Sequence, residues 1–128
     1  MEKKKILIID DDPSINTIFE FILNQAGHKS ISVNSGKEAI DLIKVSNEII
    51  LCFLDIDLKN ESGLDVFNSI SNLNNTIPTI LMCGNTPSSL LKKAFKVGAY
   101  GIIYKPFDVE EILDIISDII SNLNTNKG

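Results

Sequence analysis

The chain has 128 residues, of which 44% are hydrophobic and 23% charged, and its formal net charge at pH 7 is −5. This length and composition predict one globular domain with a core of ordinary size. The negative charge, with no Lys/Arg cluster beyond residues 3–5, argues against direct binding of nucleic acid. No apolar run approaches the roughly 20 residues that a membrane helix needs, and no signal peptide is visible. We therefore expect a cytoplasmic protein that makes no contact with membranes.

Five segments rich in branched apolar residues predict β-strands. They cover residues 5–11, 28–33, 49–57, 79–83 and 101–104. In the third segment six apolar residues run directly into Asp55, a pattern that is typical of a strand buried on both faces. The two cysteines, Cys52 and Cys83, lie within these strands, so we expect buried free thiols rather than a disulfide.

A segment with helical periodicity follows each predicted strand. The first helix is predicted to start at an Asp12 cap with Pro13 at its first position and to end at Gly27. The others are predicted from a Ser35 cap to about residue 45, from 64 to 73, from after Pro87 to Gly98, and from an Asp108 cap to Leu123. The predicted core faces are Ile15, Ile18, Phe19, Ile22, Leu23 and Ala26 on the first helix and Leu90, Leu91, Ala94 and Phe95 on the fourth.

Strands and helices alternate five times, which is the pattern of a parallel sheet with helices on both faces. Right-handed crossovers leave few arrangements, and the flavodoxin-like order 2-1-3-4-5 is the commonest for five units. We therefore predict an α/β domain with this five-stranded parallel sheet over residues 1–124. A polar tail over residues 125–128 should follow, with fraying from Asn124 onward.

In this strand order, the carboxyl ends of the first and third strands meet where ligands bind in open α/β sheets. Asp10, Asp11 and Asp55 should converge there, with Asp12 and Asp57 close by. Like charges so close together repel one another unless a cation neutralises them, and oxygen ligands without His or thiolate favour Mg²⁺. A carboxylate beside Mg²⁺ can act as a nucleophile and carry an acyl phosphate. Asp55 is therefore the candidate reactive residue, although an Asp after a strand is also a common turn former.

The order of these motifs resembles the receiver domain of bacterial two-component response regulators over nearly the whole chain. The resemblance rests on the Asp pair after the first strand, Asp55 after the third, Gly63 eight residues later, and Lys-Pro-Phe at residues 105–107 after the fifth. Each motif is common by itself, and the specificity comes from their order on the predicted elements. Which two of residues 10–12 form the Asp pair stays open; we choose Asp10 and Asp11 because they directly follow the apolar run.

The resemblance implies a phosphorylated switch that catalyses only its own phosphoryl transfer and dephosphorylation. Asp55 would accept a phosphoryl group from the phosphohistidine of a sensor histidine kinase, or from a phosphotransfer protein. Asp11 and Asp55 would bind Mg²⁺ directly, together with the backbone carbonyl of Asp57, while Asp10 would act largely through water. Phosphorylation would change a protein-binding face made of the fourth helix, fifth strand and fifth helix, which would engage a downstream protein or output domain.

Three positions depart from the family pattern. The residue at the end of the fourth strand, usually Thr or Ser, is Cys83, and a thiol is a weak donor. The usual switch aromatic is replaced by Ile102, and a common Pro by Lys59. Lys105 and Gly84 fit the pattern and are expected to contact the phosphoryl group, with Cys83 as a weaker contact and a cis peptide bond after Lys105. The departures at residues 83 and 102 predict weaker coupling between the phosphoryl group and the binding face.

Two other interpretations stay open. A receiver-like interaction module that works without phosphorylation would explain Cys83 and Ile102, but the intact acidic residues and Lys105 oppose it. A haloacid-dehalogenase-like phosphohydrolase would explain the Asp-Ile-Asp sequence at residues 55–57, but Lys59 stands where Thr or Val is expected, and the later acidic pair is missing. Stoichiometric labelling that depends on residue 55 would support the switch, whereas turnover of phosphomonoesters would support the hydrolase.

Overall fold

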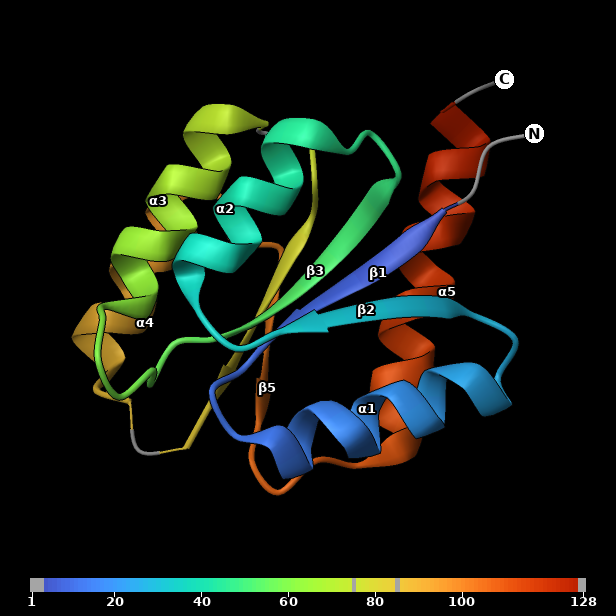
Figure 1. Cartoon of the computed structure of the whole chain (residues 1–128), viewed down its shortest axis with the longest axis horizontal. Coiled ribbons are helices and arrows are strands. Elements are labelled where there is room, and N and C mark those ends of the chain that lie inside the picture. The colour runs from blue at the N-terminus through green and yellow to red at the C-terminus, as the bar shows by residue number, and fades with distance from the viewer. Residues whose placement is uncertain (1–3, 75, 85, 127–128) are drawn as a thin grey trace.

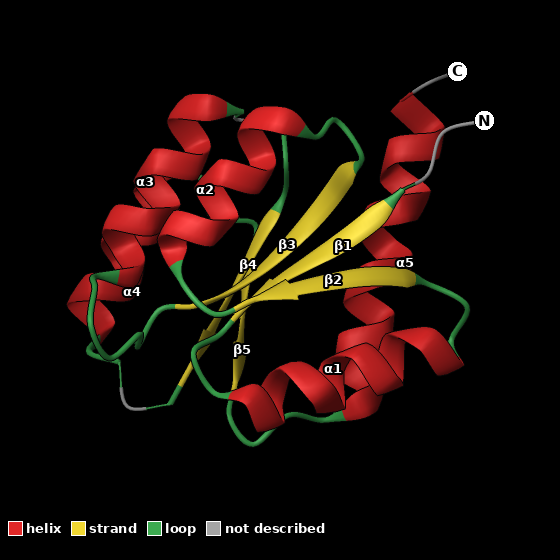
Figure 2. Cartoon of the chain, in the orientation of Figure 1, coloured by secondary structure: helices red, strands yellow, loops and turns green. Residues whose placement is uncertain are grey.

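The structure is a computed structural model that describes residues 4–74, 76–84 and 86–126. Its strands are β1 (Lys5–Ile9), β2 (Lys29–Val33), β3 (Ile49–Asp55), β4 (Thr79–Cys83) and β5 (Gly101–Tyr104). They form one parallel sheet in the order β2-β1-β3-β4-β5, which confirms the predicted order (Figure 2). None of the helices in these described ranges has the length and apolar character that crossing a bilayer would need.

Helices cover both faces of the sheet. They are α1 (Pro13–Gln25), α2 (Gly36–Val45), α3 (Gly63–Leu73), α4 (Ser88–Val97) and α5 (Val109–Asn126). Helices α1 and α5 lie against one face, and α2, α3 and α4 lie against the other (Figure 1). Successive side chains of a strand point to opposite faces, so Ile6 and Ile8 of β1 pack with α1 and α5 while Leu7 and Ile9 pack with the other three helices.

Local sequence signals set the helix ends. The side chains of Asp12, Ser35 and Asp108 each accept a hydrogen bond from a backbone N–H two or three residues further on, at 2.9, 3.2 and 2.9 Å respectively. These bonds satisfy N–H groups that have no partner in the first helical turn, and they confirm the three predicted caps. Gly98 ends α4 with a φ of +114°, a conformation that a residue with a Cβ atom rarely adopts.

The core face of α1 is narrower than predicted. Its buried stripe is centred on Phe19 and Leu23, which turns Ile18 outward to 52% exposure, while Ala26 lies exposed beyond the last turn. The assignment of Ile18 and Ala26 to the core was therefore wrong. Asn16 is buried instead, because its Nδ2 donates to a backbone carbonyl of the preceding loop at 2.9 Å.

Helices α4 and α5 also differ from the prediction. Phe95 of α4 is 47% exposed, because Leu91 and Ala94 take the buried positions of that helix. The backbone of α5 is helical through Asn126, three residues beyond the predicted end at Leu123, and the fraying of this end stays a prediction. Extending an established helix needs no new nucleation, which explains why polar residues can continue it. Residues 127 and 128 lie outside the described residues, and the domain limits of 1–124 and 125–128 stay a prediction.

Candidate functional site

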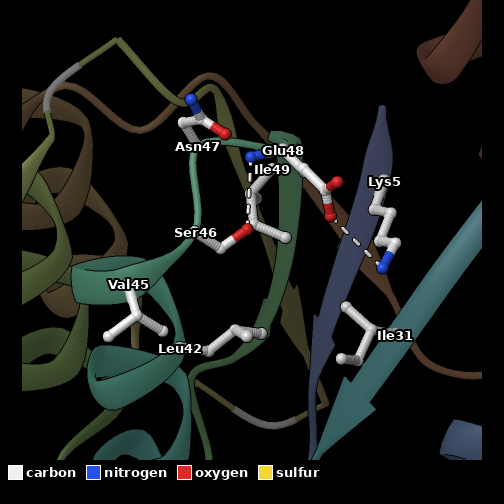
Figure 3. A pocket seen from close by; sticks show the side chains of 8 residues that line it. All are labelled: Lys5, Ile31, Leu42, Val45, Ser46, Asn47, Glu48 and Ile49. Atoms are coloured by element: carbon white, nitrogen blue, oxygen red, sulfur yellow. Dashed lines mark hydrogen bonds and ion pairs between the residues drawn. The ribbon is translucent and has the colours of Figure 1, made fainter. Parts of the chain in front are cut away.

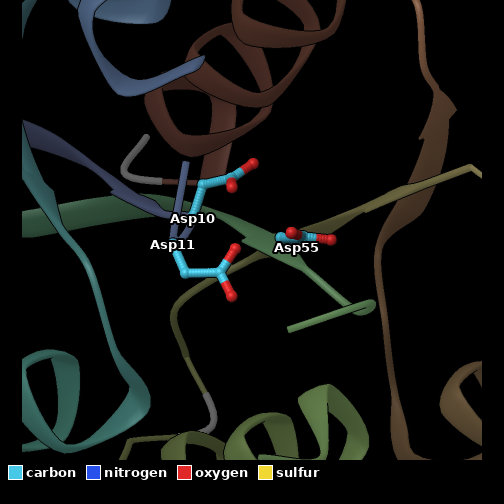
Figure 4. Close-up of side chains that lie close together, drawn as sticks. All are labelled: Asp10, Asp11 and Asp55. Atoms are coloured by element: carbon cyan, nitrogen blue, oxygen red, sulfur yellow. The ribbon is translucent and has the colours of Figure 1, made fainter. Parts of the chain in front are cut away.

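The register of the parallel strands brings the predicted carboxylates together. Strand β1 pairs with β3, and the last pair in this register is Ile9 with Leu54. The residues that follow them are Asp10 and Asp55, which therefore lie side by side. Asp10 is fully buried and Asp55 is 2% exposed. One carboxylate oxygen each from Asp10, Asp11 and Asp55 lies within 4.8 Å of the other two (Figure 4). Asp12 is exposed and caps α1, so the structure places the first two residues of the Asp run in the cluster.

Lys105 bridges two of these carboxylates. Its Nζ lies 3.3 Å from Asp10 Oδ2 and 3.3 Å from Asp55 Oδ2. Strand β5 delivers this residue to the site, because the N–H of Lys105 donates to the backbone carbonyl of Cys83 at 2.8 Å where β4 ends. The peptide bond to Pro106 is cis, as predicted. A cation from the neighbouring strand end therefore partly neutralises the buried acidic pair.

Backbone N–H groups fix the orientation of all three carboxylates. Asp10 Oδ1 and Asp55 Oδ1 each accept a hydrogen bond from the N–H two residues further on, at 2.9 Å in both cases. Asp11 Oδ2 accepts a hydrogen bond of 2.8 Å from the N–H of Lys59. Proline, which the family commonly has at that position, would have no N–H to donate. The departure at Lys59 therefore adds a bond that holds Asp11 in the cluster.

Burial and charge shift the pKa values in this cluster. Burial raises the pKa of Asp55 above its ordinary value; the N–H of Asp57 opposes this, the charge of Asp10 adds to it, and Lys105 lowers it. Burial alone would lower the pKa of Lys105, but the charges of Asp55 and Asp10 outweigh it, so that the pKa is raised. The negative charge of the three carboxylates thus exceeds the positive charge of the one ammonium that lies beside them. Their hard oxygen atoms, close to one another, match the ligands that Mg²⁺ prefers.

The side chain of Asp57 contacts the loop between β4 and α4. The N–H of Gly84 donates to Asp57 Oδ2 at 3.0 Å, and the Thr86 hydroxyl lies 2.8 Å from Oδ1 and 3.0 Å from Oδ2. Thr86 was not among the predicted site residues, because the sequence at residues 84–87 indicates only a loop. A hydroxyl residue three positions after the strand was the available signal. The role of the Asp57 backbone carbonyl as a metal ligand stays a prediction.

The two departures that concern coupling lie at β4 and β5. Cys83 is fully buried, and its Sγ donates to the backbone carbonyl of Ile103 at 3.7 Å. Burial raises the pKa of the Cys83 thiol and the charge of Asp57 adds to this, while a hydrogen bond with Thr86 lowers it. Ile102 is half-buried and packs against the core beneath α2, α3 and α4. Both cysteines are buried free thiols, as predicted, whereas the phosphoryl contacts and the switch role assigned to these positions stay predictions.

A separate hollow lies at the amino ends of the strands, opposite the acidic cluster, between the end of α2 and the start of β3 (Figure 3). Leu42, Val45 and Ile49 are among the residues that line it. Glu48, which also lines it, pairs with Lys5 at 3.3 Å between Oε2 and Nζ. Because this hollow lies at the amino ends of β1 and β3, the length of the strands separates it from the acidic cluster. It contains none of the predicted site residues.

The chain matches the family model for the response regulator receiver domain over residues 6–117. It is 28% identical over 122 residues to the DNA-binding transcriptional regulator NtrC of Klebsiella pneumoniae, covering 95% of this chain and 26% of that protein. It is 26% identical over 117 residues to sporulation initiation phosphotransferase F of Bacillus subtilis strain 168, covering 91% of this chain and 93% of that protein. The chain thus spans about a quarter of the first relative and nearly all of the second.

The fold is similar to the crystal structure of a CheY-like response regulator receiver domain protein from Methanospirillum hungatei JF-1. The TM-score is 0.90 at 23% identity, with 96% of this chain and 98% of that chain covered. This likeness establishes the fold, and the family match, which includes Asp10, Asp11, Asp55 and Lys105, confirms the relationship inferred from the motifs. The chain therefore belongs to the response regulator receiver domains, the phosphoacceptor domains of two-component signalling systems.

Proposed function

We propose that this domain is a phosphoacceptor switch in which Asp55 receives a phosphoryl group with Mg²⁺ bound beside it. The observation that carries the proposal is the cluster at the ends of β1 and β3. Three carboxylates have oxygen atoms within 4.8 Å of one another, and Lys105 Nζ lies 3.3 Å from two of those groups. This arrangement gathers a nucleophile, a cation site and a fixed positive charge at one place.

The position of Asp55 in the sheet makes it the proposed acceptor. It ends β3, the strand that lies between β1 and β4. On the β1 side it lies beside Asp10 and Asp11, and on the β4 side it pairs with Met82, two residues before the loop that begins at Gly84. A phosphoryl group on Asp55 would have the cation site on one side and N–H donors on the other. Asp10 and Asp11 belong to the β1–α1 connection and lie further from that loop.

The proposed transfer needs a carboxylate oxygen of Asp55 to attack the phosphorus of a phosphohistidine. A P–O bond forms and the P–N bond breaks, which leaves an acyl phosphate on Asp55 and a histidine that takes up a proton. Lys105, which pairs with Asp55 before the transfer, is placed to pair with a phosphoryl oxygen afterwards. Attack by water on the phosphorus would later break the P–O bond to Asp55, which restores the carboxylate and releases inorganic phosphate. The domain would thus catalyse only its own phosphorylation and dephosphorylation.

The donor set of the cluster fits Mg²⁺. Asp11 and Asp55 would hold the ion directly, together with the backbone carbonyl of Asp57, and Asp10 would act largely through water. All of these donors are hard oxygen atoms, and a divalent cation would relieve the repulsion that the Lys105 ammonium leaves uncompensated. When bound, Mg²⁺ would supply positive charge to the phosphoryl oxygens.

The surface around β5, formed with α4 and α5, is the proposed face for a downstream protein or an output domain. Its exposed large side chains are Phe95, Val97, Tyr100, Tyr104 and Val109. Exposed aromatic side chains are enriched in protein interfaces, which supports this assignment. The proposed phosphodonor is a sensor histidine kinase or a phosphotransfer protein. That donor implies a cytoplasmic location, which the two free thiols support.

One observation favours an interaction module that works without phosphate control. The Cys83 thiol donates to the backbone carbonyl of Ile103 rather than to the acidic cluster. This alternative gives no role to the contacts among Asp10, Asp55 and Lys105. Burying two carboxylates beside one another is costly, so an arrangement without a function would be hard to explain. We therefore favour the switch.

Labelling by a small phosphodonor tests the proposal. The domain is incubated with phosphoramidate and Mg²⁺, and its intact mass is then measured. We expect one added phosphoryl group on the wild type and none on Asp55→Asn, because the amide is nearly isosteric but not nucleophilic. Asp57→Asn, changed two residues away, is the matched control and should still be labelled. An unlabelled wild type, or a labelled Asp55→Asn, would overturn the proposal, and turnover of phosphomonoesters would indicate a hydrolase.

A further inference from the structure

The loop between β4 and α4 places two hydrogen-bond donors around one carboxylate oxygen. The N–H of Gly84 and the hydroxyl of Thr86 both lie 3.0 Å from Asp57 Oδ2, and the same hydroxyl lies 2.8 Å from Oδ1. Asp57 is exposed, so burial does not force its carboxylate onto this loop. The two donors therefore form an anion-binding pair, and a carboxylate is the anion that they hold in this structure.

This donor pair lies next to the proposed acceptor. The backbone N–H of Asp57 donates to Asp55 Oδ1 at 2.9 Å. This bond links Asp57, whose carboxylate binds the donor pair, to Asp55, the residue that would carry the phosphoryl group. Across the sheet, Asp55 pairs with Met82, and Gly84 follows two residues later. A phosphoryl group on Asp55 would present anionic oxygens of the same kind as those that Asp57 presents.

Cys83 is poorly suited to supply the hydroxyl contact that the family pattern places at this strand end. Its thiol is fully buried, donates to the carbonyl of Ile103 at 3.7 Å, and is intrinsically a weak donor. Thr86 follows three residues later, and its hydroxyl lies 2.8 Å from Asp57 Oδ1. The loop that follows the thiol therefore carries a stronger donor.

We infer that Thr86, rather than Cys83, supplies the hydroxyl that binds the phosphoryl group on Asp55, and that the Asp57 carboxylate holds this hydroxyl until phosphorylation. This inference rests on the proposed function. On phosphorylation, the Thr86 hydroxyl and the Gly84 N–H exchange one anionic acceptor for another. The Asp57 carboxylate, already at the surface, is released to water. Thr86 is thus a further binding residue for the phosphoryl group.

The place of Thr86 in the chain connects this exchange to the proposed binding face. Thr86 lies two residues before the start of α4 at Ser88, and Pro87 between them restricts the backbone. A shift of the hydroxyl from Asp57 towards Asp55 would therefore pull on the amino end of α4. The exchange would thereby supply, through another residue, the coupling that Cys83 is predicted to weaken.

Titration with beryllofluoride, which mimics a phosphoryl group on a carboxylate, tests the inference. Backbone NMR of the whole chain with Mg²⁺ reports both the affinity and the shifts in α4. Thr86→Val keeps the branched shape but removes the hydroxyl. It should weaken beryllofluoride binding about threefold or more and reduce the shifts in α4, because the bond to the exposed Asp57 carboxylate that is lost in the free state is worth less than the bond to the phosphoryl mimic. Thr17→Val, the matched control, removes an exposed hydroxyl of α1 that donates to the backbone carbonyl of Pro13, and it should change the affinity less than about twofold. Cys83→Ala should weaken binding less than Thr86→Val does, because a thiol is a weak donor.

The outcomes separate this inference from the proposed function. If the wild type and Thr86→Val bind beryllofluoride equally well, or if Cys83→Ala weakens binding as much as Thr86→Val, the inference is wrong and the phosphoacceptor function stands. If the wild type does not bind beryllofluoride at all, or if Asp55→Asn binds it equally well, the proposed function fails and the inference fails with it.

Hydrogen exchange of the Gly84 amide tests the change of partner itself. In the wild type this amide should be protected both with and without beryllofluoride, because an anionic acceptor is present in each state. Asp57→Ala should remove the protection in the absence of beryllofluoride and keep it in its presence. Protection that Asp57→Ala leaves unchanged without beryllofluoride, or removes in both states, would overturn the exchange.

Discussion

Replacing Lys105 with Met tests the electrostatics of the site. Met keeps most of the apolar stem but removes the ammonium that lies 3.3 Å from both Asp10 Oδ2 and Asp55 Oδ2. Both carboxylates are almost fully buried, so they would be left without their cation. In metal-free protein at pH 7, the free energy of unfolding should therefore fall. Removing one partner of a buried pair costs about 3–5 kcal/mol, but 28% of the Lys105 side chain is exposed, so we expect about 2–3 kcal/mol.

The loss should depend on pH in one direction. Burial raises the folded-state pKa of Asp55, and removing Lys105 should raise it further, because Lys105 lowers it. A group whose pKa is raised on folding contributes stability that is complete below its unfolded pKa and is lost as the pH rises through its folded pKa. The deficit of Lys105→Met should therefore be largest at neutral pH. It should shrink as the pH falls through the raised pKa of Asp55 and the carboxylate takes up a proton.

Urea unfolding of the metal-free protein between about pH 5 and pH 8 measures this dependence. Lys37→Met is the matched control, because Lys37 pairs with Asp41 at 2.9 Å on the exposed surface of α2. An exposed pair contributes little, so this control should show no measurable loss at any pH. A Lys105→Met deficit that stays constant with pH, or that is no larger than the deficit of Lys37→Met, would refute the reasoning.

Three further predictions concern metal, packing and coupling. Mg²⁺ at about 100 times its dissociation constant should add roughly 2.7 kcal/mol to the free energy of unfolding, and equal thermal midpoints with and without Mg²⁺, in both wild type and Asp11→Asn, would remove the metal site. Gly63→Ala should cost about 1–3 kcal/mol in chemical unfolding, because its Cβ would overlap the backbone after β3, whereas Gly101→Ala has ordinary contacts at 3.6 Å; equal losses would contradict this. Cys83→Thr should keep phosphorylation and enlarge the beryllofluoride shifts in α4 and β5, by less than Thr86→Val reduces them; unchanged shifts would show that Cys83 does not weaken coupling.

The acidic cluster could be predicted because each part of it has a local signal. Asp10 and Asp55 each follow an apolar run, and the parallel order of the strands brings those two ends side by side. The helix starts were predictable for the same reason, since a cap such as Ser35 acts within one turn. The Lys105 contact with Asp55 could be anticipated because residue 105 follows the fifth strand at the neighbouring corner of the sheet, whereas no local pattern relates residue 105 to residue 10.

The features that were missed depend on partners far away in the sequence. Thr86 has its role because Asp57, on a different loop, accepts its hydrogen bond, and the direction of a loop side chain cannot be inferred from spacing. Asn16 is a polar residue of a type that is usually exposed, and it is buried here because its amide donates to the backbone carbonyl of Asp10. Ile18 and Phe95 belong to apolar stripes whose buried width is set by the shape of the sheet, and periodicity does not report that shape.

Mapping the phosphoryl group to one residue tests the central claim most directly. Borohydride reduces an aspartyl phosphate to homoserine, so the acceptor keeps a permanent change of mass that peptide mass spectrometry can locate. After treatment of the wild type with phosphoramidate and Mg²⁺, homoserine should be found at position 55. Homoserine at Asp10, Asp11 or Asp57, with Asp55 unchanged, would contradict the account.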